Sequence, residues 1–253
     1  FCNIHREPIT KEVQVSNLDM DAAEKGGYEH FMLKEIHEQP TALQSTFTPR
    51  AGTPGQYSWL PVTPQEARAL RKISIVACGT AYHAGVLGKY AIERLARVPV
   101  EAEIASEYRY RDPIVGENEL FIAVSQSGET ADTLAALREA KRRGARVMAI
   151  CNVVGSTITR EVGEENTLYT YAGPEIAVAS TKAYSVQCAL LFLLAIRLAT
   201  ANGKLDVSEA VTLCRTLRDE VPVAVEKALR QSDEVKELSA FLAGREHVFY
   251  IGR

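Results

Sequence analysis

The chain has 253 residues, 46% of them hydrophobic, which is enough for one complete α/β core with residues left for further elements. A formal net charge of −3 with interspersed signs provides no basic stripe, so nucleic acid is excluded as an expected partner. Five cysteines, an odd number without a Cys-x-x-Cys pair, fit reduced cytosolic thiols better than a disulfide framework.

Residues 1–64 are predicted to form an arm ahead of the core. Residues 12–27 are polar and charged, residues 28–38 have a helical pattern, and Pro40 can occupy the first position of another helix. Residues 52–56 are rich in glycine and proline and are predicted to be a loop. Residues 1–5 run at once into charged residues instead of a signal peptide, so we expect a cytoplasmic location.

Predicted strands and helices alternate from residue 65 to residue 203, which is the pattern of a parallel sheet covered on both faces. We therefore expect a three-layer α-β-α domain with a five-stranded parallel sheet. Strands are predicted at 73–78, 100–104, 120–124, 147–151 and 168–171, and helices at 82–97, 131–143 and 181–201. The last helix includes a long apolar stretch at 183–200, which contains Gln187 and Arg197 and follows Lys182, so a buried core helix is expected rather than a membrane span.

Residues 204–245 are predicted to be connecting helices, at 207–230 with an interruption at Pro222 and at 232–242. Residues 246–253 resemble the first predicted strand, because charge is followed by a β-rich run and then by glycine. A lone strand cannot complete a βαβ unit. We therefore expect the chain to be a fragment that stops within a second domain of the same kind.

The most informative stretch is the loop from Ser125 to Thr130, between the third strand and the helix after it. The free N–H groups and the dipole of a helix N-terminus attract an anion. One Ser-x-Ser-Gly can serve as an ordinary N-cap, but Ser125, Ser127 and Thr130 offer three hydroxyls beside the amide of Gln126. The loop contains no Lys or Arg and is not a nucleotide-binding P-loop. It predicts a phosphate site made of neutral donors, suited to a small sugar phosphate.

Other polar loops follow the first, fourth and fifth strands, at the edge of the sheet where ligands bind in open parallel folds. Gly79 can let the backbone approach a ligand or can simply form a tight turn. Residues 155–157 fit a turn followed by an N-cap, with a ligand role as the alternative. Ser180 and Thr181 can bind a sugar or cap the following helix.

Two titratable residues near these loops raise the question of catalysis. Lys182 could form a Schiff base with a carbonyl sugar or with pyridoxal phosphate, but a lysine whose ammonium reaches water is the simpler interpretation. His83 could act as an acid or base, or could be a half-buried helix histidine. The five histidines are scattered, so no metal site is predicted.

Three motifs together resemble the sugar isomerase (SIS) domain family: Cys78-Gly79-Thr80, the segment 125–132 and the segment 175–183. With residues 31–40 and 106–110 they resemble, more narrowly, the isomerase half of the glucosamine-6-phosphate synthase family. Those enzymes are isomerizing glutamine-fructose-6-phosphate transaminases, which make glucosamine-6-phosphate and glutamate from fructose-6-phosphate and glutamine. A glutaminase domain passes ammonia to two SIS domains. The resemblance implies no nicotinamide, metal or pyridoxal phosphate.

The resemblance also implies which residues contact the ligand. Ser125, Gln126, Ser127 and Thr130 would hold the phosphate, and Thr80, Val178 and Ser180 would contact the sugar. Ala81 stands where the family often has serine, so one hydroxyl is missing while the backbone N–H remains.

The family's glutaminase cysteine and its isomerising glutamate, histidine and lysine have no counterpart in this chain, so no catalytic residue is assigned. Because proton transfer between C1 and C2 needs a positioned base, we expect the chain to recognise sugar phosphate without converting it. The expected partners are fructose-6-phosphate or glucosamine-6-phosphate, the missing glutaminase and second SIS domains, and a second copy in a homodimer. The alternative is a SIS-type phosphosugar sensor of a transcription regulator, although the chain lacks a basic helix-turn-helix.

Overall fold

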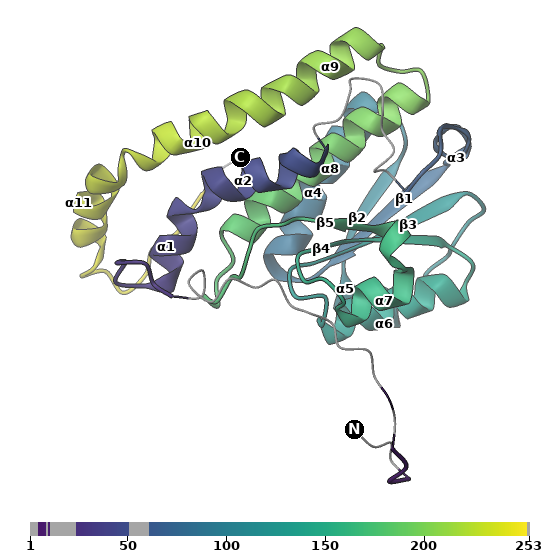
Figure 1. Ribbon diagram of the computed structural model, residues 1–253, viewed down its shortest axis with the longest axis horizontal. Coiled ribbons are helices and arrows are strands. Elements are labelled where there is room, and N and C mark those ends of the chain that lie inside the picture. Colours follow the sequence, from purple (N-terminus) through teal and green to yellow (C-terminus); the bar gives the residue numbers. More distant parts are fainter. Residues whose placement is uncertain (1–4, 9, 11–23, 51–60, 252–253) are drawn as a thin grey trace.

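A five-stranded, all-parallel sheet forms the middle layer of the computed structural model, which describes residues 5–8, 10, 24–50 and 61–251 (Figure 1). Its strands are β1 (Lys72–Ala77), β2 (Val100–Ile104), β3 (Glu119–Ser125), β4 (Arg146–Cys151) and β5 (Thr167–Tyr169). With helices on both faces, this is the predicted three-layer α-β-α architecture, and the fold class is confirmed.

All strands are parallel, and their order is β2-β1-β3-β4-β5, so the side of the sheet on which new strands are added changes between β1 and β3. The chain leaves β1 for one edge of the sheet at β2 and then returns past β1 to build the other side. Ala77 of β1 pairs with Val124 of β3, so the loops that follow these two strands start side by side. In open parallel sheets such a switch point is where a crevice forms and ligands bind.

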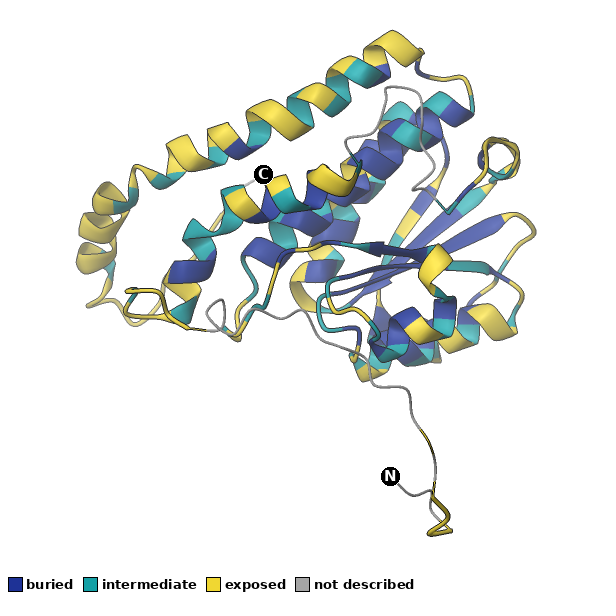
Figure 2. Cartoon of the chain, in the orientation of Figure 1, coloured by how far each residue is buried: buried dark blue, intermediate teal, exposed yellow. Residues whose placement is uncertain are grey.

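Alternate side chains of β1, β3 and β4 enter two separate cores, as the pleat of a strand requires. Ile75 and Ile122 join the core under α4 (Gly79–Leu95) and α8 (Lys182–Ala201). Val76 and Phe121 join the core under α5 (Ala105–Tyr110), α6 (Ala131–Arg142) and α7 (Thr157–Val162). The two helical layers therefore lie on opposite faces of the sheet, and the central strands β1 and β3 are buried between them (Figure 2).

Helix α8 is the central helix of one core. It is long and apolar enough to cross a membrane, but 67% of its apolar window is buried inside the protein. It packs closely along α4, where a Cβ on Gly88 would come within 2.9 Å of Leu191. Its position bears out the expected core helix and explains why so apolar a sequence occurs here.

Helix α2 (Gln39–Phe47) of the arm and the C-terminal helices α9 (Val207–Arg215) and α10 (Val221–Leu229) lie on the α4–α8 side of the sheet (Figure 1). Helix α2 packs against both α8 and α10. The interruption predicted at Pro222 is a π-helical segment just before it, and Pro222 lies in the first turn of α10, where a missing N–H costs little. The remaining elements are α1 (Phe31–His37), η2 (Thr48–Arg50), α3 (Pro64–Ala69), η3 (Glu164–Asn166), η4 (Thr216–Glu220) and α11 (Ser232–Leu242).

One predicted element does not form. Residues 246–251 have no strand pairing, and Phe249, Tyr250 and Ile251 are 88%, 90% and 96% exposed. A strand needs a neighbour for its backbone hydrogen bonds, and the described part of the chain places none beside this segment. The predicted loop at 52–56 and the last two residues lie outside the described residues.

Candidate functional site

A cavity of about 210 Å³ opens at the carboxyl ends of β1 and β3, at the switch point of the sheet. It is bounded by the loop after β1, the loop after β3, the segment before α8 and one side chain of α8 itself. All seven residues predicted to contact a ligand line this cavity: Thr80, Ser125, Gln126, Ser127, Thr130, Val178 and Ser180. Segments separated by as much as a hundred residues are therefore brought together as predicted, while their binding role stays a prediction.

The hydroxyls of the loop after β3 give it a fixed shape. Ser125 Oγ accepts a hydrogen bond from the Gly128 N–H at 3.0 Å and lies 3.1 Å from Thr130 Oγ1. Ser127 Oγ accepts the Glu129 N–H at 3.2 Å. Thr130 is the N-cap residue of α6 but makes no side-chain cap hydrogen bond. The structure therefore does not support the capping alternative, and the first turn of α6 keeps its attraction for an anion.

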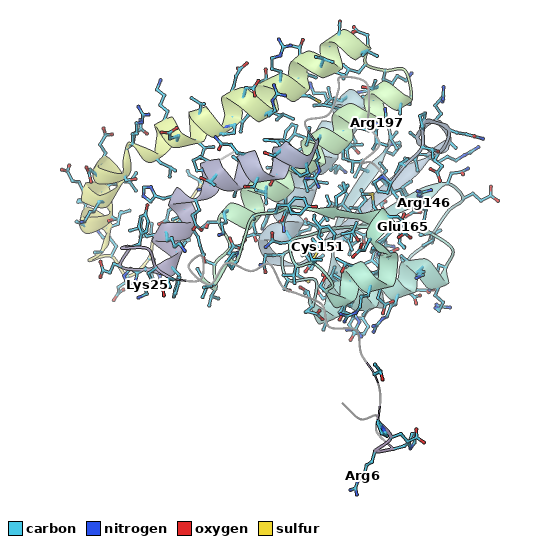
Figure 3. All side chains as sticks on the ribbon, viewed as in Figure 1. Arg6, Lys25, Arg146, Cys151, Glu165 and Arg197 are labelled. Atoms are coloured by element: carbon cyan, nitrogen blue, oxygen red, sulfur yellow. The ribbon has the colours of Figure 1, made fainter. Side chains whose placement is uncertain are left out.

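Gly128 is required at the tip of this loop for two reasons. Its φ of +68° lies in the left-handed region, and a Cβ there would lie 2.1 Å from Ser156 Oγ and 2.8 Å from Cys151 Sγ. Cys151 ends β4 (Figure 3), and burial raises the pKa of its thiol, which keeps it neutral under the loop. The loop therefore rests directly on buried side chains.

Residues 155–157 contact the Ser125–Thr130 loop and do not line the cavity. Ser156 is the N-cap residue of α7 without a side-chain cap bond, and the Thr157 N–H instead donates to Glu129 Oε1 at 2.7 Å. Hydrogen bonds from Thr157, through its side chain and then its backbone, lower the pKa of Glu129. Residues 155–157 therefore form a turn with Ser156 at the N-cap position, where Glu129 and not the Ser156 side chain accepts the free N–H, and they take no part in lining the cavity.

The segment before α8 is shaped by Glu175, which the motifs did not single out as a structural residue. Glu175 Oε1 accepts the N–H groups of Thr181 at 2.9 Å and of Ala183 at 3.1 Å, and its Oε2 accepts the Ser180 hydroxyl at 2.8 Å. Glu175 therefore caps α8, and neither Ser180 nor Thr181 does so. Its distance along the chain from the helix start differs from the usual capping spacing, so local sequence rules do not find it.

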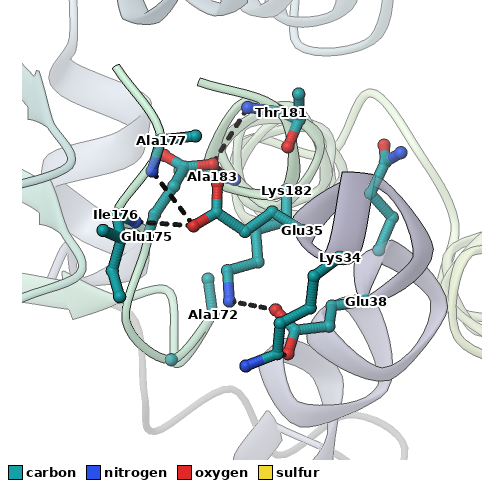
Figure 4. Close-up of polar contacts among 12 residues, drawn as sticks. Lys34, Glu35, Glu38, Ala172, Glu175, Ile176, Ala177, Thr181, Lys182 and Ala183 are labelled. Atoms are coloured by element: carbon teal, nitrogen blue, oxygen red, sulfur yellow. Dashed lines mark hydrogen bonds and ion pairs between the residues drawn. The ribbon is translucent and has the colours of Figure 1, made fainter. Parts of the chain in front are cut away.

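The arm holds the same segment from the other side (Figure 4). Glu35 of α1 is 2% exposed, and its Oε1 accepts the N–H groups of Ile176 at 2.6 Å and of Ala177 at 3.2 Å. These two residues directly precede Val178, so the arm fixes the backbone of a predicted sugar-contacting residue. The sequence assigned the arm no such role, because Glu35 and Ile176 are 141 residues apart.

Lys182 and His83 do not occupy the places expected of them. The Lys182 side chain is 3% exposed, and its Nζ lies 2.6 Å from Glu38 Oε2 (Figure 4). The prediction that its ammonium reaches water was wrong, because Glu38 of the arm supplies a half-buried counter-ion. His83 is exposed, with its ring 5.2 Å from that of Tyr82, so it is not the half-buried residue expected. Neither residue lines the cavity.

The cavity wall also includes residues that the sequence did not single out for ligand contact. They are Cys78, Ala81, Val124, Glu175, Ala177 and Gln187. Most are small or apolar and complete the wall, while Glu175 is occupied by its hydrogen bonds.

Comparison with known proteins adds independent evidence. The SIS domain family matches residues 68–197. The chain is similar to the isomerizing glutamine-fructose-6-phosphate aminotransferase of Symbiobacterium thermophilum, with 55% identity over 98% of this chain and 41% of that protein. It is 51% identical to the protein of the same name from Clostridium acetobutylicum, over 100% of this chain and 41% of that protein. The chain thus spans about two fifths of the length of these relatives.

A solved structure is similar over most of the chain. The C-terminal domain of glucosamine-fructose-6-phosphate aminotransferase from Francisella tularensis superposes with a TM-score of 0.80 and 37% sequence identity. The match covers 91% of this chain and 64% of that one. The resemblance inferred from the motifs is confirmed.

Proposed function

Because the chain belongs to the SIS domain family, we propose that its cavity binds a hexose phosphate, fructose-6-phosphate or glucosamine-6-phosphate. It would do so as part of the isomerase half of an isomerizing glutamine-fructose-6-phosphate aminotransferase, the name carried by its relatives. The observation that carries the proposal is the convergence of neutral hydrogen-bonding groups from three separate loops on one cavity of about 210 Å³.

The phosphate would lie over the loop from Ser125 to Thr130. The cavity wall formed by the described residues contains no Lys or Arg, and its one acidic side chain, Glu175, is engaged by hydrogen bonds. A phosphate dianion would therefore be held by the hydroxyls of Ser127 and Thr130, the Gln126 amide and the N-terminus of α6. Hydrogen bonds to a charged group are the stronger kind, so neutral donors suffice.

The sugar would face the segment before α8 and Thr80. Ser180 donates its proton to Glu175, which leaves the lone pairs of its hydroxyl oxygen to accept from a sugar hydroxyl. Val178 lines the cavity with its side chain fully exposed, so its backbone is the group available for contact. A second SIS domain and a glutaminase domain would supply the catalytic groups and the ammonia.

We further propose a cytoplasmic homodimer for the parent protein. The four described cysteines, Cys78, Cys151, Cys188 and Cys214, are free thiols, which supports a reducing compartment. Large apolar side chains of α11 are exposed, including Val235, Leu238 and Phe241 at 62%, 59% and 65%, which supports a covering domain or copy.

Titration calorimetry of the chain with fructose-6-phosphate, fructose and inorganic phosphate tests the proposal. We expect binding of the hexose phosphate and none of fructose, because the charged group provides most of the affinity. Ser127→Ala should weaken fructose-6-phosphate binding about tenfold or more, whereas the exposed Ser239→Ala on α11 should not change it. Absence of hexose phosphate binding at millimolar concentration would refute the proposal.

A further inference from the structure

Gln187 is a buried polar residue in the wall of the cavity. It lies on α8, is 1% exposed and belongs to the residues that line the cavity. Its Oε1 has no hydrogen-bond partner. Among the buried side-chain atoms of the described residues that lack a partner, this oxygen is the one whose residue lines the cavity.

An unpartnered amide oxygen in such a place is unfavourable for the folded chain by itself. Burial removes its hydrogen bonds to water, and native proteins satisfy nearly all such groups. The surroundings of Gln187 on α8 are apolar, with Val186 and Leu190 fully buried in the same core. Folding alone gains nothing from this oxygen, whereas a ligand hydroxyl in the cavity would provide its missing donor.

The position of α8 determines which part of a ligand Gln187 can reach. Helix α6, which begins at the phosphate loop, covers one face of the sheet, and α8 covers the opposite face. The cavity lies at the switch point between these two layers. A ligand whose phosphate occupies the Ser125–Thr130 loop therefore extends its sugar toward α8.

We propose that the Gln187 side-chain amide is a specificity-determining contact that accepts a hydrogen bond from a sugar hydroxyl. The inference rests on the proposed hexose phosphate function and deepens it, because it separates recognition of the sugar from recognition of the phosphate. A hydrogen bond to a buried amide discriminates strongly, since a ligand without the matching hydroxyl leaves the amide unpaired.

The test compares Gln187→Met, which keeps the side-chain length and removes the amide, with the exposed Gln44→Leu on α2 as a matched control. Each variant is titrated with fructose-6-phosphate and with inorganic phosphate, and its thermal unfolding is measured without ligand. Gln187→Met should weaken fructose-6-phosphate binding about five- to tenfold, leave phosphate binding unchanged and not lower the melting temperature. The control should match the unchanged chain in all three measurements.

Unchanged fructose-6-phosphate affinity in Gln187→Met overturns the inference. Equal loss of affinity for both ligands, with a lowered melting temperature, also overturns it, because that result indicates a structural role. If Gln187→Met folds poorly, Gln187→Asn replaces it, and the side-chain amide signal of Gln187 in the unchanged chain must shift with fructose-6-phosphate and not with phosphate. Absence of hexose phosphate binding by the unchanged chain would instead show that the proposed function has failed.

Discussion

Replacing Gly128 by alanine tests how the Ser125–Thr130 loop is supported. A left-handed backbone costs a residue with a Cβ about 1–2 kcal/mol, and Gly128 has a φ of +68°. The new Cβ would also lie 2.1 Å from Ser156 Oγ and 2.8 Å from Cys151 Sγ, and both neighbours are buried. Forcing extra volume into a packed site costs about 1–3 kcal/mol. We therefore expect Gly128→Ala to lower the free energy of unfolding by about 2–5 kcal/mol in total.

Gly203→Ala is the matched control. Gly203 has a φ of +75°, and a Cβ there meets nothing within 4 Å, so only the backbone cost of about 1–2 kcal/mol applies. Urea unfolding measures both free energies, and titration with fructose-6-phosphate measures the effect on the loop. We expect Gly128→Ala to lose hexose phosphate binding and Gly203→Ala to keep it. Equal destabilisation in the two variants would refute the argument that the loop rests on Ser156 and Cys151.

Three further predictions concern the acidic residues around the site. Glu35→Ala should lower the free energy of unfolding in urea by about 2–4 kcal/mol, because two backbone N–H groups lose a charged acceptor. The control Glu29→Ala, at an exposed position, should change the free energy of unfolding by no more than about 0.5 kcal/mol. Similar losses in both variants would contradict the role of Glu35 in holding the segment before α8. Glu38→Ala should lower the free energy of unfolding by about 3 kcal/mol, because the buried Lys182 ammonium loses this partner. Lys182→Met should lower it less, and the reverse order would contradict the role of Glu38 as the counter-ion of a buried lysine. The lowered pKa of Glu129 implies stabilisation that is fully present above its ordinary pKa of 4.5 and is lost as the pH falls through the folded-state pKa. The melting temperatures of the unchanged chain and of Glu129→Gln should therefore become equal in acid. A difference in melting temperature that persists in acid would contradict the stabilising role of the Glu129 carboxylate.

The predicted strands agree with the structure where the local signal is strong. Residues 120–124 were predicted from an apolar run, and β3 spans Glu119–Ser125, because the middle of a strand covered on both faces is lined by apolar side chains. The segment at 246–251 carried a similar β-rich signal and formed no strand. The two segments differ because β3 pairs with neighbouring strands and residues 246–251 pair with none, and the periodicity of a segment does not show whether a neighbouring strand is present.

The edge of the sheet that holds the candidate site was predictable for a related reason. Parallel strands end at the same edge of their sheet, so the polar loops after the first, third, fourth and fifth strands were expected there. The family resemblance then implied seven residues, which all line one cavity, whereas residues 155–157 of the loop after the fourth strand do not line it. Glu175 and Glu35 were missed as supports because capping rules describe near neighbours, whereas these carboxylates reach N–H groups in other segments.

The alternation of strands and helices, the parallel sheet and the neutral hydrogen-bonding groups of the Ser125–Thr130 loop follow from the amino-acid sequence, because periodicity and loop chemistry are local properties of the chain. Three other features follow from tertiary contacts: Lys182 is buried against Glu38, the arm holds the segment before α8, and the Gln187 amide oxygen lies without a partner in the cavity wall. These features depend on burial and on contacts between segments up to 144 residues apart. The free energy of a buried charge or amide depends on its exposure to water and on its hydrogen-bond partners, and both are set when distant segments pack together in the folded chain.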